Sequence, residues 1–207
     1  MPPDSSDPTL PRCFWTAGIP EFLAYHDQEW GFPVGDDTRL FEKMSLETFQ
    51  SGLSWRTILN KREAFRRAFA GFCIDTVARF DEAEVAHLLT DAGIVRHRGK
   101  IEATIANARV AGQLRERHGS LAAFVWRFEP DLATRPSRLD AETVRTLSES
   151  PASRALAAAL KQAGWRFFGP TTAYAFMQAM GLINDHTEDC WCRPLVETAR
   201  THFLRPG

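Results

Sequence analysis

The feature that most constrains the fold is a hydrophobic period of roughly 3.6 residues that recurs along almost the whole chain. Between positions 54 and 69, for example, Ile58, Leu59 and Phe65 fall on one side of a helix and basic residues on the other. Strand-like alternation is nearly absent. The sequence therefore predicts an all-α fold, with helices over about residues 20–30, 37–51, 55–69, 82–91, 99–117, 154–163 and 171–180.

The length of the chain, 207 residues, is that of one ordinary domain. A chain of this size buries about 70% of its unfolded surface and needs no disulfide bonds to hold a core. We expect a single domain over residues 12–193, formed by two lobes that share a core, with a helical hairpin near residues 88–101. The polar, proline-rich residues 1–11 are predicted to be a disordered leader, residues 129–147 a loop and residues 194–207 a C-terminal tail.

Composition limits where the protein can be located in the cell and which partners it can bind. No apolar run approaches the ~20 residues of a membrane span, and no secretory signal precedes the folded part, so we expect a cytoplasmic protein without a membrane partner. Lys and Arg number 25 against 26 Asp and Glu, a formal net charge of −1. That balance argues against a histone-like polyanion binder, although it allows a local basic face.

A local basic face is present around a glycine turn between two predicted helices. Gly93 and Ile94 form the turn, and Arg96, Arg98 and Lys100 follow it. Backbone N–H groups near a helix N-terminus bind anions, so this hairpin could hold a DNA phosphate. An ordinary connection between helices, with basic side chains in water, fits the same residues.

Two pairs of metal-binding residue types lie near opposite ends of the chain. They are Cys13 with His26, and His186 with Cys190. Two thiolates and two imidazoles complete a closed tetrahedral zinc shell, which is structural rather than catalytic. Cys192 competes for the fourth position, and unrelated core residues are the alternative interpretation.

Aromatic residues are dense around an isolated acid. Glu47 falls on the apolar side of its helix, where a carboxylate is costly to bury unless something pairs with it. A cationic ligand stacked between aromatic rings would be such a partner. A glutamate that points to solvent is the alternative. The aromatic residues concerned are Trp15, Phe22, Tyr25, Trp30 and Trp55.

Taken together, these stretches resemble the DNA-3-methyladenine glycosylase I family of the helix-hairpin-helix glycosylase superfamily. The matching strings occur in the family's order between about residues 12 and 190. They are residues 12–15, 25–33, 46–47, 50–59, 91–101, 169–172 and 184–186. The resemblance implies the helix-hairpin-helix glycosylase fold and a bacterial cytosolic DNA repair enzyme that works at the nucleoid.

The resemblance also implies roles for individual residues. Glu47 would be the catalytic residue in a base pocket, with Tyr25 and Trp55 stacking on a flipped base and Trp15, Phe22 and Trp30 as further base-binding residues. Leu53 would fill the gap left in the duplex, and the DNA-binding hairpin residues would be Gly93, Ile94, Arg96, Arg98 and Lys100. A structural zinc ion would be held by Cys13, His26, His186 and Cys190. The chain departs from the family pattern at Phe22, where a tyrosine is expected, and at Phe49 and Ser51.

The implied reaction is hydrolysis of the N-glycosidic bond of 3-methyladenine in alkylated double-stranded DNA, leaving an abasic site. Lyase-type members of the superfamily carry a lysine where this chain has His97, so we expect a glycosylase without lyase activity. We expect a monomer, since nothing in the sequence implies a protein partner. A zinc-containing helix-hairpin-helix module that binds damaged DNA without catalysis is the alternative.

Overall fold

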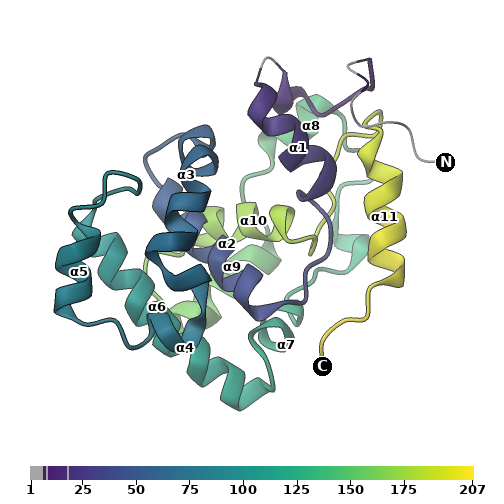
Figure 1. Ribbon diagram of the computed structural model, residues 1–207. Helices are drawn as coiled ribbons and strands as arrows, with labels where there is room; N and C mark the ends of the chain where they lie inside the picture. The colour runs from purple at the N-terminus through teal and green to yellow at the C-terminus, as the bar shows by residue number, and fades with distance from the viewer. Residues whose placement is uncertain (1–6, 8, 18) are drawn as a thin grey trace.

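The computed structural model describes residues 7, 9–17 and 19–207, and it is built of helices joined by short turns (Figure 1). No strand occurs in these ranges, so the all-α prediction is confirmed. The α-helices are α1 (Pro20–Gln28), α2 (Asp37–Gln50), α3 (Trp55–Ala68), α4 (Ile74–Val77), α5 (Glu82–Leu88), α6 (Arg98–His118), α7 (Leu121–Trp126), α8 (Ala141–Thr146), α9 (Pro151–Gln162), α10 (Pro170–Ala179) and α11 (Cys192–His202). Short 3₁₀ turns are η1 (Phe14–Thr16), η2 (Ala70–Phe72) and η3 (Leu132–Thr134).

Helix α2 forms the centre of the molecule. It contacts α3, α6, α7 and α10, and its side chains are buried on every face from Leu40 to Phe49. The Asp36 carboxylate caps its first turn by accepting the Arg39 N–H at 2.8 Å. Because α2 is enclosed on all sides, any charged residue in its middle is carried into the interior.

Several helix boundaries follow the capping residues that the sequence offers. Ser54 accepts the Thr57 N–H at the start of α3, and Asp81 caps α5. Helices α4 and α7 lie outside the predicted helix ranges, and two further segments differ from prediction. The predicted loop at 129–147 contains α8. The predicted tail after residue 193 is mostly α11, which is fixed to the core by the fully buried Val196.

The N-terminal segment lies next to the residues that lead into α11 (Figure 1). The Trp191 N–H donates to the Pro11 carbonyl at 2.9 Å, and the Gly31 N–H donates to the Ala179 carbonyl at 3.3 Å. Residues 1–6 and 8 of the predicted leader lie outside the described residues. Across the described part of the chain, no helix combines the length and apolar character needed to span a bilayer.

Candidate active site

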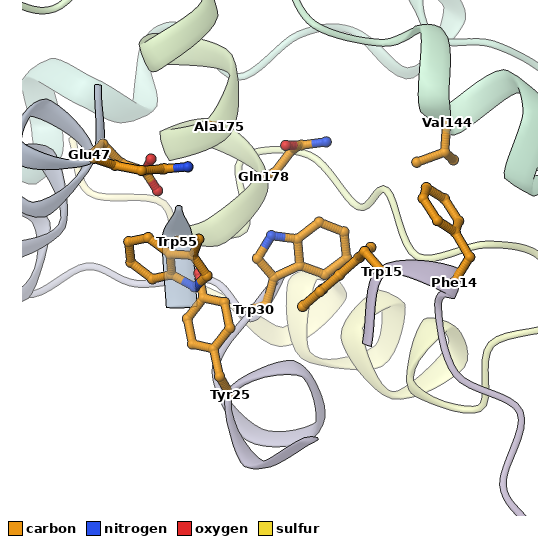
Figure 2. Close-up of a pocket in the computed structure, with 10 residues that line it drawn as sticks. Phe14, Trp15, Tyr25, Trp30, Glu47, Trp55, Val144, Ala175 and Gln178 are labelled. Carbon is orange, nitrogen blue, oxygen red and sulfur yellow. The ribbon is translucent and has the colours of Figure 1, made fainter. Parts of the chain in front are cut away.

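An aromatic pocket of about 250 Å³ opens where η1, α1 and the loop after it face α2, α3, α8 and α10. Figure 2 shows its side chains converging from these separate elements. The volume is small for a ligand site and suits a single flat ring system. The lining residues are Phe14, Trp15, Tyr25, Trp30, Glu47, Gln50, Trp55, Val144, Ala175 and Gln178.

Aromatic rings supply most of the pocket wall. Trp15 and Trp30 meet edge to face with centroids 5.1 Å apart, and the Tyr25 and Trp55 rings are 5.3 Å apart. These four residues were predicted to surround a base, and the structure brings them together. Phe22 differs from its prediction as a base-binding residue: it is buried and packs edge to face on Trp15 at 5.7 Å, outside the pocket lining.

Glu47 is buried in the pocket wall, but it is not the isolated carboxylate that the sequence suggested. The Lys43 Nζ lies 2.7 Å from the Glu47 Oε1, and both side chains are almost inaccessible. Burial lowers the pKa of Lys43, and the adjacent carboxylate opposes that shift. The four-residue spacing on one helix is a signal that could have identified this pair from sequence.

Gln178 on α10 adds a second polar group to the pocket lining, and no pattern in the sequence marked it. Its Nε2 donates to the Asp185 Oδ2 at 2.8 Å. A carboxylate can only accept, so the amide nitrogen must face Asp185. The carbonyl oxygen therefore occupies the other end of the amide, on the side toward Trp55 and Glu47 in Figure 2.

Cys13, His26, His186 and Cys190 form one buried group, with their ligand atoms all within 4.8 Å of one another. The group joins the N-terminal segment to the loop before α11. It also supports the pocket: the His186 ring lies 4.6 Å from that of Trp30, and the His26 ring lies 5.2 Å from that of Trp15. A metal ion bound here would hold two walls of the pocket.

The donor set fits a metal ion in its details. Asp27 binds the His26 Nδ1 at 2.7 Å, and Asn184 binds the His186 Nδ1 at 3.0 Å, so each Nε2 faces the group. Among the described atoms, the buried His186 Nε2 has no hydrogen-bond partner. Burial lowers the pKa of His186 to about 4, which keeps the imidazole neutral as a ligand requires. Cys192 lies instead beside the His26 Nδ1, at 3.7 Å.

The glycine turn between α5 and α6 has the geometry of a tight hairpin. A Cβ on Gly93 would lie 2.8 Å from the Asp91 Oδ1 and 3.0 Å from the Ala64 Cβ, so a larger residue would have to displace the Asp91 side chain. Its N–H donates to Asp91 at 2.7 Å and is therefore used within the turn. The Ile94 side chain is buried, so a DNA contact at this position would involve the backbone.

The basic residues of the hairpin fall into three different environments. Arg96 is exposed. Arg98 is exposed but forms ion pairs with Glu82 at 2.6 Å and Glu102 at 3.2 Å. Lys100 differs from its prediction as a DNA contact, because it is buried and its ammonium points inward. Only Arg96 of these three combines exposure with a charge that the structure does not pair.

Lys100 instead joins the hairpin to the turn between α2 and α3. Its Nζ donates to the carbonyls of Phe49 at 3.0 Å and Ser51 at 2.6 Å, which are groups that the end of α2 leaves without a helical partner. Gly52 adopts a φ of +83°, a conformation that favours glycine. This turn projects Leu53, which is 43% exposed although apolar.

Comparison with known proteins identifies the architecture. The family model for methyladenine glycosylases matches residues 15–193. The chain belongs to the methyladenine glycosylase family. It is 45% identical over 186 residues to DNA-3-methyladenine glycosylase 1 of Escherichia coli (strain K12), covering 89% of this chain and 98% of the relative.

Solved structures of the family agree. A crystal structure of 3-methyladenine DNA glycosylase I aligns with a TM-score of 0.80 at 44% identity, covering 89% of this chain and 100% of the other. The Staphylococcus aureus enzyme, described for its recognition of 3-methyladenine, aligns with a TM-score of 0.82 at 33% identity, covering 88% and 96%. The predicted family, the glycosylase fold and the assignment as a glycosylase enzyme are confirmed.

Proposed function

We propose that this protein hydrolyses the N-glycosidic bond of 3-methyladenine in alkylated double-stranded DNA and leaves an abasic site. The observation that carries the proposal is the aromatic pocket with a buried carboxylate in its wall. The E. coli relative is a DNA-3-methyladenine glycosylase, which agrees with this substrate. Glu47 is the proposed catalytic residue, and Tyr25, Trp15, Trp30 and Trp55 are the proposed base-binding residues.

Recognition follows from the charge of the lesion. 3-Methyladenine in DNA carries a formal positive charge, whereas adenine is neutral. Aromatic ring faces attract a cation by ~0.5–2 kcal/mol, and the Glu47 carboxylate adds a charge-assisted interaction. The Gln178 carbonyl oxygen offers a second acceptor for donors on the edge of the base. The pocket therefore favours the alkylated base over its normal counterpart.

The reaction needs little further machinery. The enzyme flips the nucleotide out of the duplex at a cost of a few kcal/mol. The glycosidic bond then breaks and its electron pair neutralises the departing cationic base. Water adds to the oxocarbenium-like sugar and loses one proton to solvent, which leaves the abasic site. His97 caps α6 by accepting the Lys100 N–H at 3.2 Å. The position at which lyase-type relatives carry a nucleophilic lysine is therefore a histidine in this chain. We propose a hydrolase without a lyase step.

DNA contacts follow from the exposed surface beside the pocket. We propose that Leu53 fills the gap in the duplex, since it is an exposed apolar side chain on a turn that Lys100 holds. The backbone at Gly93 and Ile94 and the charge of Arg96 would contact phosphate. Arg98 would contribute less because its acidic neighbours offset its charge.

We propose that the metal at Cys13, His26, His186 and Cys190 is zinc. Two cysteines and two histidines are typical of closed structural zinc sites. Zinc would supply no step of hydrolysis; it would tie together segments that are far apart in sequence. We further propose a monomer that acts in the bacterial cytosol, at the nucleoid, and folds as a single domain from about residue 12.

Base release from methylated DNA tests the activity. Purified protein incubated with methylated duplex DNA should liberate 3-methyladenine, measured by chromatography against a boiled control. Tight binding to methylated or abasic duplex without base release would overturn the enzymatic proposal. That result would favour a non-catalytic zinc-containing module that binds damaged DNA.

A further inference from the structure

One buried ammonium group contacts three residues of the pocket wall. The Lys43 Nζ pairs with the Glu47 Oε1 at 2.7 Å and donates to the Tyr25 Oη at 2.8 Å. It also lies 3.5 Å from the centroid of the Trp55 ring. Lys43 is not itself a lining residue; it stands behind the wall and contacts the groups proposed to hold the base.

Helix stability does not account for the pair. A glutamate that precedes lysine by four residues is the favourable order in a helix, and here lysine comes first. Glu47 also lies in the last turn of α2, where the helix dipole disfavours negative charge. A buried ion pair is, in addition, often less stabilising than packed apolar side chains of similar volume. We therefore attribute the presence of the Lys43–Glu47 pair to the function of the pocket and not to the stability of α2.

We propose that Lys43 is a positioning residue: its ammonium is the counter-charge of the Glu47 carboxylate, binds one carboxylate oxygen and leaves the second for the base, and fixes Tyr25 and Trp55. Lys43 thereby sets the lowest pH at which the protein excises a cationic base. This inference rests on the proposed function, because it assigns a role within the same pocket.

The other charges around the pair are already occupied. On α3, Arg62 pairs with Glu29 at 2.6 Å and Arg66 pairs with Glu42 at 2.8 Å. Other titratable groups on packed elements include Tyr25 on α1, which Lys43 itself contacts, Arg39 on α2, Lys100 on α6, whose ammonium binds carbonyls, and Tyr174 on α10, which binds Asp185. Helix α7 contains no titratable side chain. Lys43 is therefore the direct counter-charge of Glu47.

The pH dependence follows from this geometry. The lesion carries its positive charge throughout the acid range. A fall in the rate of base release toward low pH, the acid limb of the pH–rate profile, therefore reports titration of the protein. Replacement of Lys43 by an uncharged side chain leaves a buried carboxylate without a partner, which favours its protonated form. A neutral acid attracts a cationic base less than a carboxylate does. The acid limb should then move to higher pH.

The decisive experiment compares Lys43→Met, which keeps the length of the side chain without its charge, with wild type. Release of 3-methyladenine from methylated duplex DNA is followed from about pH 5 to about pH 9. In Lys43→Met, the acid limb should move to higher pH by about one unit or more. At pH values below the acid limbs of both proteins, the variant should release base roughly tenfold more slowly than wild type, and the difference should be smaller at alkaline pH. Lys43→Arg, which restores the charge, should return the limb toward wild type. Lys161→Met, an exposed lysine on α9, is the matched control and should leave the limb unchanged.

Thermal melting provides a readout that does not depend on catalysis. In Lys43→Met, the buried carboxylate takes up a proton more readily in the folded than in the unfolded state. Relative to wild type, this variant should therefore lose melting temperature as pH rises from about 4 to about 8. The double variant Lys43→Met/Glu47→Gln should lose that dependence. If Lys43→Met does not fold at neutral pH, recovery of folding in the double variant supports the pair, and failure of both overturns it.

The outcomes separate the two proposals. Absence of base release by wild type would refute the proposed function, and the melting profiles would still decide whether Lys43 acts as the counter-charge of Glu47. Base release by wild type, with acid limbs and melting profiles of Lys43→Met that coincide with wild type, would overturn the role of Lys43 alone.

Discussion

Glu47 and Lys43 are both almost completely buried, which is rare for charged side chains unless they are paired. Removal of one partner leaves the other as an unpaired buried charge, which lowers the free energy of unfolding by about 3–5 kcal/mol. Truncation of Glu47 to alanine would therefore mix a loss of function with a loss of stability. A substitution that keeps the shape and hydrogen bonding of the side chain separates the two effects better.

Glu47→Gln should lower base release by about 10²- to 10³-fold, the usual effect of losing one preorganised electrostatic group. The protein should remain folded, because the amide still accepts from Lys43 and burial already favours the neutral amine. Single-turnover kinetics on methylated duplex and circular dichroism check this prediction. Glu116→Gln, at an exposed position on α6, serves as control. Base release by Glu47→Gln at the wild-type rate would remove Glu47 from the catalytic role.

Among secondary-structure elements, the hairpin shows which features the sequence could predict. The period and the capping residues placed α3, α5 and α6 to within a few positions, because both signals are local. The inward direction of Lys100 was not predictable, since it depends on carbonyls at the end of α2, about fifty residues earlier in the chain. The same limit applies to Gln178 and Val144, which reach the pocket only through the packing of α10 and α8.

The different environments of Arg96 and Lys100 predict different salt dependences of DNA binding. Arg96→Ala should weaken DNA binding and reduce the slope of log affinity against log salt by about one, as expected for the loss of one phosphate contact. Lys100→Met should lower the melting temperature and the base-release rate but leave the salt slope unchanged, because its ammonium is committed to the protein interior. Fluorescence anisotropy with labelled duplex at several salt concentrations measures both slopes. A reduced slope for Lys100→Met would place its charge on DNA.

For the molecule as a whole, the contact between the N-terminal segment and the loop before α11 supports two rings of the pocket wall, Trp15 and Trp30. Helical class and family were readable from the sequence, because period and short motifs persist along the chain. The closeness of Cys13 and Cys190 could be inferred only from residue types and the resemblance. No local pattern shows that the His26 and His186 rings support Trp15 and Trp30.

Metal removal should therefore affect stability and the pocket together. Elemental analysis should find one zinc ion per chain, and chelation should lower the melting temperature and change tryptophan fluorescence. Cys190→Ser should abolish metal binding, whereas Cys73→Ser, at an exposed position, should bind metal like wild type. A metal-free preparation with an unchanged melting temperature would contradict the structural role.

The contact between the first and last segments also has a consequence for synthesis on the ribosome. Translation delivers Trp15 and Trp30 early and delivers His186 and Cys190 near the end, so a nascent chain carries unsupported aromatic residues through most of its elongation. Domains generally fold as units once their residues have emerged. Excision activity should therefore arise only after Cys190 has emerged, and a chain truncated before residue 186 should expose these rings to aggregation and to chaperones.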